Sequence, residues 1–422
     1  MKKLYTLLIL PLFLINFGVS AQDFWEQLPF PYEVSIMCIA TNEQGDIFVG
    51  AGYDVDNGGV YRSLDDRQTW DLVLDMVSFS VLSIEINEQG IIYAGTNRGF
   101  PTLCVSYNNG INWEELILPS TDNVVKILCI STDTVYVSQW TEGALLLRSA
   151  DSGSTWDTIY SSNHASEYVS DIAISSTGVI YISLDGFFFE MGGVYRSTDN
   201  GQTWECAGLF NYQVKALGFN NYDDLLIGVW AGFYDISGGL YVIYNGESEI
   251  HDLYYGPAVW DLVINSDDDI YFAIDGGYVM RTLDLGQTFE FVNQGLIGSG
   301  HMAIDNQDYV YNASAYGNNK VNRTIEPTVT SVTAFSGPEI LKFESAQNPV
   351  TDKYWVRIIG PDDMHGTGNF IISDLAGRAF INGLFDIANK YFETDVSRLR
   401  PGMYILTVKI GNEYYSAKFI KP

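Results

Sequence analysis

One short motif recurs along the chain and restricts the possible folds more than any other feature. The pattern is Ser-x-Asp-x-Gly-x-Thr-Trp, and its five copies are Ser63–Trp70, Ser106–Trp113, Ser149–Trp156, Ser197–Trp204 and Thr282–Phe289. The first four copies start 43, 43 and 48 residues apart, and the gap of 85 before the last copy spans two units. Residues 239–246 (GLYVIYNG) keep a strand-like run and an Asn-Gly turn, so we interpret them as a degenerate copy. A period near 40–45 residues indicates a repeat protein.

A second recurring position supports this period. Each unit has a large residue in a strand-like segment that follows a polar turn, and we call these the marker residues: Phe48, Tyr93, Tyr136, Tyr181, Leu226, Tyr271 and Tyr311. Their spacings of 45, 43, 45, 45, 45 and 40 define seven units. A single unit of short strands cannot bury both faces of its sheet, so the units must pack around an axis. The sequence therefore predicts an all-β fold with a seven-bladed β-propeller.

The ends of the repeat region predict how the ring closes. The seventh unit runs out near Pro327 without a motif or a fourth strand. Near the other end, residues 24–30 (FWEQLPF) resemble residues 112–119 (NWEELILP), which the repeat assigns to a fourth strand. We expect Phe24–Pro29 to pair with the third strand near Val321–Ile325, which would remove an open sheet edge.

The motif resembles the Asp-box, also called the BNR repeat, and the matches cover about residues 36–325. The resemblance implies a hairpin turn between the third and fourth strands of a blade. Aspartate, glycine and serine suit such a turn, because the first and last form local hydrogen bonds and glycine permits positive φ. We expect a structural role for the motif residues, with the aromatic ring between blades: Ser63, Asp65, Trp70, Ser106, Gly110, Trp113, Ser149, Asp151, Gly153, Trp156, Ser197, Asp199, Gly201, Trp204, Thr282, Asp284, Gly286 and Phe289.

Two copies of the motif depart from the pattern, and arginines precede most copies. Asp66-Arg67 stand where the first copy should have glycine, and Asn108 replaces aspartate in the second, so we expect strained or weaker turns there. Four arginines come directly before a motif and should lie far apart around the rim: Arg62, Arg148, Arg196 and Arg281. Sialidases, which contain Asp-boxes, need three converging arginines, and this arrangement argues against that activity.

The variable segments predict where a ligand would bind. In a four-stranded blade, the loop after the second strand and the connection to the next blade share one face. These loops place aromatic rings beside carboxylates, a combination that suits sugars, although the same rings could pack on one another. The candidate ligand-binding residues are Tyr53, Asp54, Trp140, Glu142, Asp185, Phe187, Trp230, Tyr234, Asp235, Asp275 and Tyr278.

These residues leave two classes of function open. The first is a non-catalytic module that binds a glycan or a protein. The second is a glycoside hydrolase, which needs two carboxylates about 5–9.5 Å apart. The sequence does not choose a catalytic pair among its candidates, which are Asp54, Glu142, Asp185, Asp235 and Asp275.

No metal or other cofactor is expected. Asp267-Asp268-Asp269 lack the spacing of an EF-hand and fall in a turn, which we interpret as a solvated acidic turn. We assign His164, His251 and His301 to connections between blades, and they share no spacing that indicates a zinc site.

Charge and the N-terminal residues place the chain outside the cytoplasm. The formal net charge is −30, and a surface this acidic repels phosphate backbones, which excludes nucleic acid as a partner. Residues 1–21 combine Lys2 and Lys3, an apolar run and a small residue at Ala21, as in a cleavable signal peptide. No later segment is long enough to span a bilayer. We therefore expect a signal peptide at 1–21, the propeller at 22–327, a linker at 328–337 and a separate domain at 338–422.

The last 85 residues have strand-like alternation but no propeller period. Their landmarks are Asn348-Pro349, Asp374–Arg378, Leu399–Tyr404 and Lys418–Lys421. In this order they resemble the C-terminal sorting domain of the type IX (Por) secretion system. The resemblance implies a small Ig-like β-sandwich, read by the outer-membrane translocon after passage through the periplasm, and a secreted or cell-surface protein. A generic carbohydrate-binding Ig-like module is the alternative.

Overall fold

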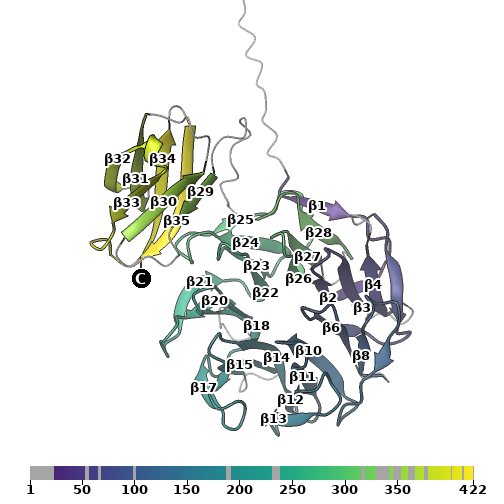
Figure 1. Cartoon of the computed structure of the whole chain (residues 1–422). Helices are drawn as coiled ribbons and strands as arrows, with labels where there is room; N and C mark the ends of the chain where they lie inside the picture. The colour runs from purple at the N-terminus through teal and green to yellow at the C-terminus, as the bar shows by residue number, and fades with distance from the viewer. Residues whose placement is uncertain are drawn as a thin grey trace, which may run out of the picture.

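The computed structural model describes the chain from residue 23 to residue 421, apart from residues 53–56, 65–67, 98–100, 187–191, 231–237, 315–318, 329–341, 346–352, 360–365, 375–378, 401 and 411–412. The described residues form strands and one short 3-10 helix, η1 (Ile387–Asn389). Seven four-stranded antiparallel sheets surround one axis, as the sequence predicts, and two further sheets follow (Figure 1). The predicted signal peptide and most of the predicted linker lie outside the described residues.

Each blade runs outward from the axis in four strands. The innermost strands are β2 (Ser35–Thr41), β6 (Val81–Ile86), β10 (Asn123–Cys129), β14 (Glu167–Ile174), β18 (Val214–Phe219), β22 (Val259–Ile264) and β26 (Gly300–Ile304). The second strands are β3 (Ile47–Gly52), β7 (Ile92–Thr96), β11 (Val135–Trp140), β15 (Ile180–Gly186), β19 (Leu225–Val229), β23 (Ile270–Ile274) and β27 (Val310–Ser314).

The third and fourth strands form the outer half of each blade. The third strands are β4 (Gly59–Ser63), β8 (Leu103–Ser106), β12 (Ala144–Ser149), β16 (Gly193–Ser197), β20 (Gly238–Ile243), β24 (Tyr278–Thr282) and β28 (Val321–Thr324). The fourth strands are β5 (Asp71–Asp75), β9 (Glu114–Glu115), β13 (Asp157–Ser161), β17 (Glu205–Gly208), β21 (His251–Gly256), β25 (Glu290–Phe291) and, for blade 7, β1 (Trp25–Leu28).

The ring closes through the N-terminal strand. β1 pairs antiparallel with β28, from Trp25 opposite Thr324 to Leu28 opposite Val321, which is the pairing expected from the sequence. Trp25 is 1% exposed, and its indole N–H donates to the main-chain carbonyl of Val292 in blade 6. Blade 7 is thus completed by a segment that lies almost 300 residues away from β28 in the chain.

The repeated motif forms the turn between the third and fourth strands. In the four copies whose turn is described, the first hydroxyl accepts the N–H of the motif glycine at 2.8 Å, as Ser149 does from Gly153. The side chain at the third position accepts the N–H four residues later, also at 2.8 Å. These two bonds close the turn from inside and leave its glycine with positive φ.

The Asn108 copy, expected to be strained or weaker, is not strained but has one hydrogen bond fewer than the other described copies. Asn109 and Gly110 have φ of 57° and 79°, close to the values in the other copies. An amide oxygen accepts the main-chain N–H as a carboxylate does, so the substitution keeps that bond. What is lost is the hydroxyl bond that Thr155 donates to Asp151, because Asn112 stands in its place. Asp65 and Asp66-Arg67 of the first copy lie outside the described residues.

Seven apolar clusters join the blades, and each has the same two members. One is the marker residue of a blade, and the other is a residue of the following blade that we call the wedge residue. The marker–wedge pairs are Phe48 and Trp113, Tyr93 and Trp156, Tyr136 and Trp204, Tyr181 and Ile250, Leu226 and Phe289, Tyr271 and Trp25, and Tyr311 and Trp70. The aromatic rings of the motif thus lie between blades, as expected. Every marker residue is buried, whereas among the wedge tryptophans only Trp25 and Trp70 are.

The arginines that precede the motifs do not converge. Arg148, Arg196 and Arg281 each pair with the first residue of the fourth strand in their own blade, at 3.8, 2.7 and 2.6 Å respectively. They therefore lie at equivalent places around the rim, as the sequence predicts.

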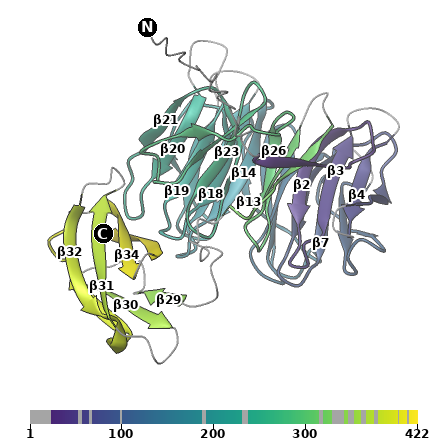
Figure 2. The same ribbon diagram turned by 90° about the horizontal axis from the view of Figure 1, so that it is seen from above.

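The C-terminal residues form a two-sheet sandwich (Figure 2). One sheet holds β29 (Lys342–Ser345), β30 (Lys353–Ile359) and β33 (Tyr391–Asp395), and the other holds β32 (Ala379–Asp386), β31 (Thr367–Asp374), β34 (Gly402–Ile410) and β35 (Glu413–Lys421). Tyr354 and Phe392 from the first sheet share one buried cluster with Phe370, Leu406 and Phe419 from the second. The sandwich therefore has a core of its own.

Trp25→Ala should destabilise the propeller strongly, because it removes a buried indole and opens the closing contact between blades 6 and 7. We expect a loss of about 3–5 kcal/mol in the free energy of unfolding, measured by urea denaturation. Trp260→Ala is the matched control, since Trp260 is 37% exposed and should cost much less. Equal losses in the two variants would contradict the assignment of Trp25 as the closing wedge.

Candidate functional site

Four aromatic side chains gather at the end of the axis where the second strands stop and the innermost strands begin. Trp140 ends β11 and Trp230 directly follows β19, whereas Tyr168 and Trp260 are the second residues of β14 and β22. The ring centroids of Trp140 and Tyr168 are 5.6 Å apart, and those of Trp230 and Trp260 are 6.0 Å apart. Together with Lys215 and Asp185, these side chains form what we call the aromatic site.

Lys215 links the two aromatic pairs. Its Nζ lies 5.9 Å from the ring centroid of Tyr168, 6.0 Å from that of Trp230 and 5.6 Å from that of Trp260. These distances are in the range of cation–π attraction. Three rings thus lie around the ammonium, and the Lys215 side chain as a whole is 21% exposed.

Asp185 holds this lysine in place. Its side chain is 2% exposed and forms an ion pair with Lys215, and it also accepts the phenolic hydrogen of Tyr168. The other carboxylate oxygen accepts the N–H of Gly186 at 2.7 Å. A buried carboxylate needs such partners to offset its loss of hydration. Asp185 therefore positions the lysine and the tyrosine.

β-bulges in two innermost strands orient Lys215 and Trp260 toward the aromatic site. Register shifts leave one extra residue between Val214 and Ala216 in β18 and between Val259 and Asp261 in β22. The extra residues are Lys215 and Trp260. A bulge turns the side chain of its extra residue away from the ordinary alternation, and here it brings both side chains to the aromatic site.

The structure brings three of the predicted ligand-binding residues together. Trp140, Asp185 and Trp230 belong to the aromatic site. Glu142 and Asp275 are exposed, and Tyr278 packs edge-to-face on Phe291 in the outer half of blade 6. Five predicted residues lie outside the described part of the chain: Tyr53, Asp54, Phe187, Tyr234 and Asp235.

Sequence reasoning missed Tyr168, Lys215 and Trp260 because they lie on innermost strands, where a large residue is an ordinary finding. One signal was available. In the aligned repeat, Lys215 and Trp260 share the position directly after the buried valine that begins their strand, where a charge or an indole is not required for packing.

Five titratable side chains on five different innermost strands form what we call the axial cluster. They are Glu85, Lys126, Asp171, Asp261 and His301. Lys126 Nζ lies 2.8 Å from a carboxylate oxygen of Asp171. The carboxylates also join blades, because Asp171 accepts the N–H of Leu217 at 2.8 Å and Asp261 accepts that of Met302 at 2.9 Å. These bonds indicate a structural role.

Burial changes the protonation of the axial cluster. It raises the pKa of the Glu85 carboxyl to about 7 and that of Asp261 to about 6, against the attraction of the Lys126 ammonium. Burial, together with Lys126, lowers the pKa of His301 to about 4, so this imidazole is neutral at pH 7. The assignment of the histidines to connections between blades is wrong for His301, on β26, and for His251, on β21.

The acidic turn at Asp267–Asp269 is not solvated as expected. Asp268 is 7% exposed and Asp269 is 1% exposed. Asp268 accepts the N–H of Asn221 in the preceding blade at 2.7 Å, so the turn is a contact between blades. Among the described residues, no group of three or more histidine, cysteine, aspartate or glutamate side chains has the arrangement of a metal site.

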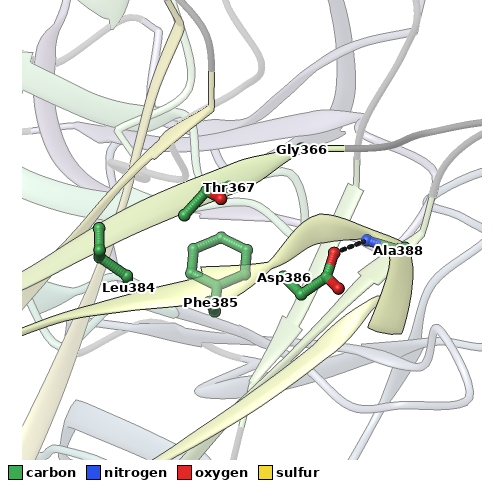
Figure 3. Close-up of a pocket in the computed structure, with 6 residues that line it drawn as sticks. All are labelled: Gly366, Thr367, Leu384, Phe385, Asp386 and Ala388. Atoms are coloured by element: carbon green, nitrogen blue, oxygen red, sulfur yellow. Dashed lines mark hydrogen bonds between the residues drawn. The ribbon is translucent and has the colours of Figure 1, made fainter.

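The sandwich has a shallow pocket of its own, lined by Gly366, Thr367, Leu384, Phe385, Asp386 and Ala388 (Figure 3). The Asp386 carboxylate accepts the N–H of Ala388 at 3.0 Å and caps η1. This charged group therefore serves the local fold, and the aromatic site remains the stronger candidate.

Comparison with known families identifies the C-terminal residues. Residues 348–422 match the family described as the secretion system C-terminal sorting domain. This domain marks proteins exported by type IX secretion to the cell surface or the extracellular space. In the part of the chain that the structure describes, no helix has the length and apolar character needed to cross a membrane.

Solved structures resemble the chain in fold. YCF48 bound to D1 peptide is 15% identical with a TM-score of 0.55, over 72% of this chain and 97% of that one. PorZ of Porphyromonas gingivalis, an essential surface component of the type IX secretion system, is 13% identical with a TM-score of 0.54, over 93% of this chain and 60% of PorZ. Oligogalacturonate lyase from Vibrio parahaemolyticus is 9% identical with a TM-score of 0.53, over 72% of this chain and 94% of the lyase.

At these identities the likeness shows the fold alone. No curated protein sequence matches the chain. The chain is an exported β-propeller that carries a type IX secretion sorting domain.

Glu85→Gln should stabilise the protein at high pH. The folded protein holds the Glu85 proton up to about pH 7, whereas an unperturbed glutamate releases it near 4.5. The stability associated with this group is therefore complete below pH 4.5 and is lost as the pH rises through 7. Since glutamine cannot ionise, the urea midpoint of the variant should exceed that of the wild type at pH 8 and equal it at pH 4.5. The exposed Glu88→Gln is the control, and a gain of the same size at both pH values would contradict the argument.

Proposed function

We propose that this protein is a non-catalytic, secreted or cell-surface propeller that binds a glycan at the aromatic site. One observation carries the proposal: two indoles and a phenol surround the ammonium of Lys215, and a third indole, that of Trp140, packs beside the phenol. Binding sites for small ligands combine apolar and aromatic walls with a few placed polar groups. The C–H faces of a sugar would stack on the rings of Trp230 and Trp260, while its hydroxyls would bond to the polar groups between them.

The chemistry of Asp185 favours binding over hydrolysis. A glycoside hydrolase needs a carboxylic acid and a second carboxylate on either side of the scissile bond. Among the described residues of the aromatic site, Asp185 is the one carboxylate, and Lys215 and Tyr168 both engage it. The alternative, a glycoside hydrolase, would require a second carboxylate near Asp185, and the candidates from the sequence are Asp54, Glu142, Asp235 and Asp275.

We also propose that the repeated turns are Asp-boxes and that residues 338–422 are read by the type IX translocon. The first proposal is supported by the paired bonds in each described turn, one to a hydroxyl and one to an aspartate or asparagine side-chain oxygen. The second is supported by the family match to residues 348–422 and by a sandwich with its own buried core.

Replacing an indole of the aromatic site should weaken glycan binding. We expect Trp230→Ala and Trp260→Ala each to raise the dissociation constant about tenfold, as one stacked ring contributes about 1.4 kcal/mol. The mature chain would be screened on a glycan array and against chromogenic glycosides, and affinities would be measured by calorimetry. Tyr255→Ala, at a ring that is 72% exposed on β21, is the control.

Two results would contradict the binding proposal. One is binding that survives both tryptophan changes. The other is turnover of a glycoside that Asp185→Asn abolishes, which would establish the hydrolase instead.

The sorting role is tested best by transfer. Deleting Lys418–Pro422 would also remove Phe419, which is fully buried in the sandwich core, so loss of export could reflect unfolding. Fusing residues 338–422 to a periplasmic reporter should instead place the reporter on the cell surface, measured by protease accessibility in cells with and without the translocon. A reporter that stays periplasmic would contradict the sorting role.

A further inference from the structure

Blade 5 has lost the repeated turn without losing any length. Its third and fourth strands are joined by Tyr244–Ile250, as many residues as Thr198–Trp204 in blade 4. The side chains that fold the turn are absent, because Ile243 stands where blade 4 has Ser197, and Glu247 stands where it has Gly201.

Without a hydroxyl to accept the N–H of residue 247, the connection folds differently. The N–H of Glu247 donates to the carbonyl of Tyr244 at 2.9 Å, which closes a tight turn over four residues. Gly246 takes the positive φ, 80°, one position before the motif glycine of blade 4. The tight turn at Tyr244–Glu247 therefore replaces the longer motif turn.

A pocket of about 260 Å³ lies at this place between blades 4 and 5. Blade 4 lines it with Ser175, Tyr181 and Arg196, and blade 5 with Phe219 and the tight turn. Tyr181 is the marker residue of blade 4, so the pocket lies beside the cluster where other blades insert a wedge aromatic. We call this pocket the vacant slot.

Intact blades show what occupies the equivalent space. The arginine before a motif reaches across to the turn of the next blade, where Arg148 donates to the main-chain carbonyl of Asn200 at 3.5 Å and Arg62 donates to that of Asn109. The glycine that follows lies against the previous blade, and a Cβ on Gly201 would be 2.8 Å from the Cβ of Ile159. The occupant is therefore the Asn-Gly main chain of a turn.

Arg196 has no such turn to meet. Its hydrogen bonds are to Glu205, at 2.7 Å, and to Tyr181, both in its own blade. The other charged side chains near the slot are engaged, since Asp223 accepts from Ser176 at 2.8 Å and Glu247 pairs with His251 at 2.8 Å. What the slot offers a ligand is thus a guanidinium beside aromatic walls.

We propose that the vacant slot binds a peptide turn from another protein, one that resembles the missing motif. A main-chain carbonyl of the bound turn accepts a hydrogen bond from Arg196, as Asn200 does from Arg148. A glycine after that carbonyl permits the close approach to blade 4, and an aromatic residue four positions after the carbonyl packs toward Tyr181. This site is separate from the aromatic site and lies on the opposite face of the propeller, where the motif turns are.

The test uses a synthetic peptide with the sequence of residues 196–204, RSTDNGQTW, and the mature full chain. We expect saturable binding in a titration followed by NMR, with no binding of a scrambled peptide of the same composition. The triple variant I243S/E247G/I250W restores the chain's own turn and should fill the slot. We expect its affinity for the peptide to be at least tenfold lower, with a melting temperature at least as high as that of the wild type.

Controls make each outcome decisive. The variant I117S changes an isoleucine that is 82% exposed in blade 2, and it should bind the peptide as the wild type does. Equal binding of the RSTDNGQTW peptide and of its scrambled form would overturn the proposal, and so would unchanged binding of the RSTDNGQTW peptide to the triple variant. Competition by a glycan that binds the aromatic site would likewise overturn it, because the two sites lie on opposite faces.

Discussion

The structure depends on one packing contact that occurs seven times: a marker residue of one blade against a wedge residue of the next. A blade alone exposes an apolar face on each side, and only its two neighbours can remove both faces from water. The marker residues are buried throughout, whereas the wedge residues range from Trp25, at 1% exposure, to partly exposed tryptophans. The tightest contacts, at Trp25 and Trp70, lie on either side of the closing blade.

The sequence was sufficient for the parts of the fold that repeat. The motif, the marker residues and the fragment FWEQLPF predict the number of blades and the pairing of β1 with β28, because the same physical requirement is met in every unit. It was misleading where a single residue decides the outcome. Asn108 keeps an unstrained turn because its amide oxygen accepts the same bond, and Asp268 is buried because a neighbouring blade supplies the N–H of Asn221.

The candidate site was only half predictable for a similar reason. Trp140, Asp185 and Trp230 lie at or directly after the ends of second strands, so they can be predicted from the positions of the loops. Lys215 and Trp260 reach the site through bulges in innermost strands, and a bulge shows itself only once two strands are paired. The vacant slot is a further case, since the degenerate copy is visible in the sequence but the pocket that it leaves is not.

Closure by the N-terminal strand also constrains the order of events during synthesis. The ion pair between Glu26 and Arg323 spans 297 residues, and the strands that hold it cannot meet until nearly all of the propeller has left the ribosome. Contacts of such sequence separation form late, because the intervening chain must first be ordered. The nascent chain thus carries β1 as a strand without its partner until β28 follows, and the predicted sorting domain begins only a short distance after the strand that completes this step.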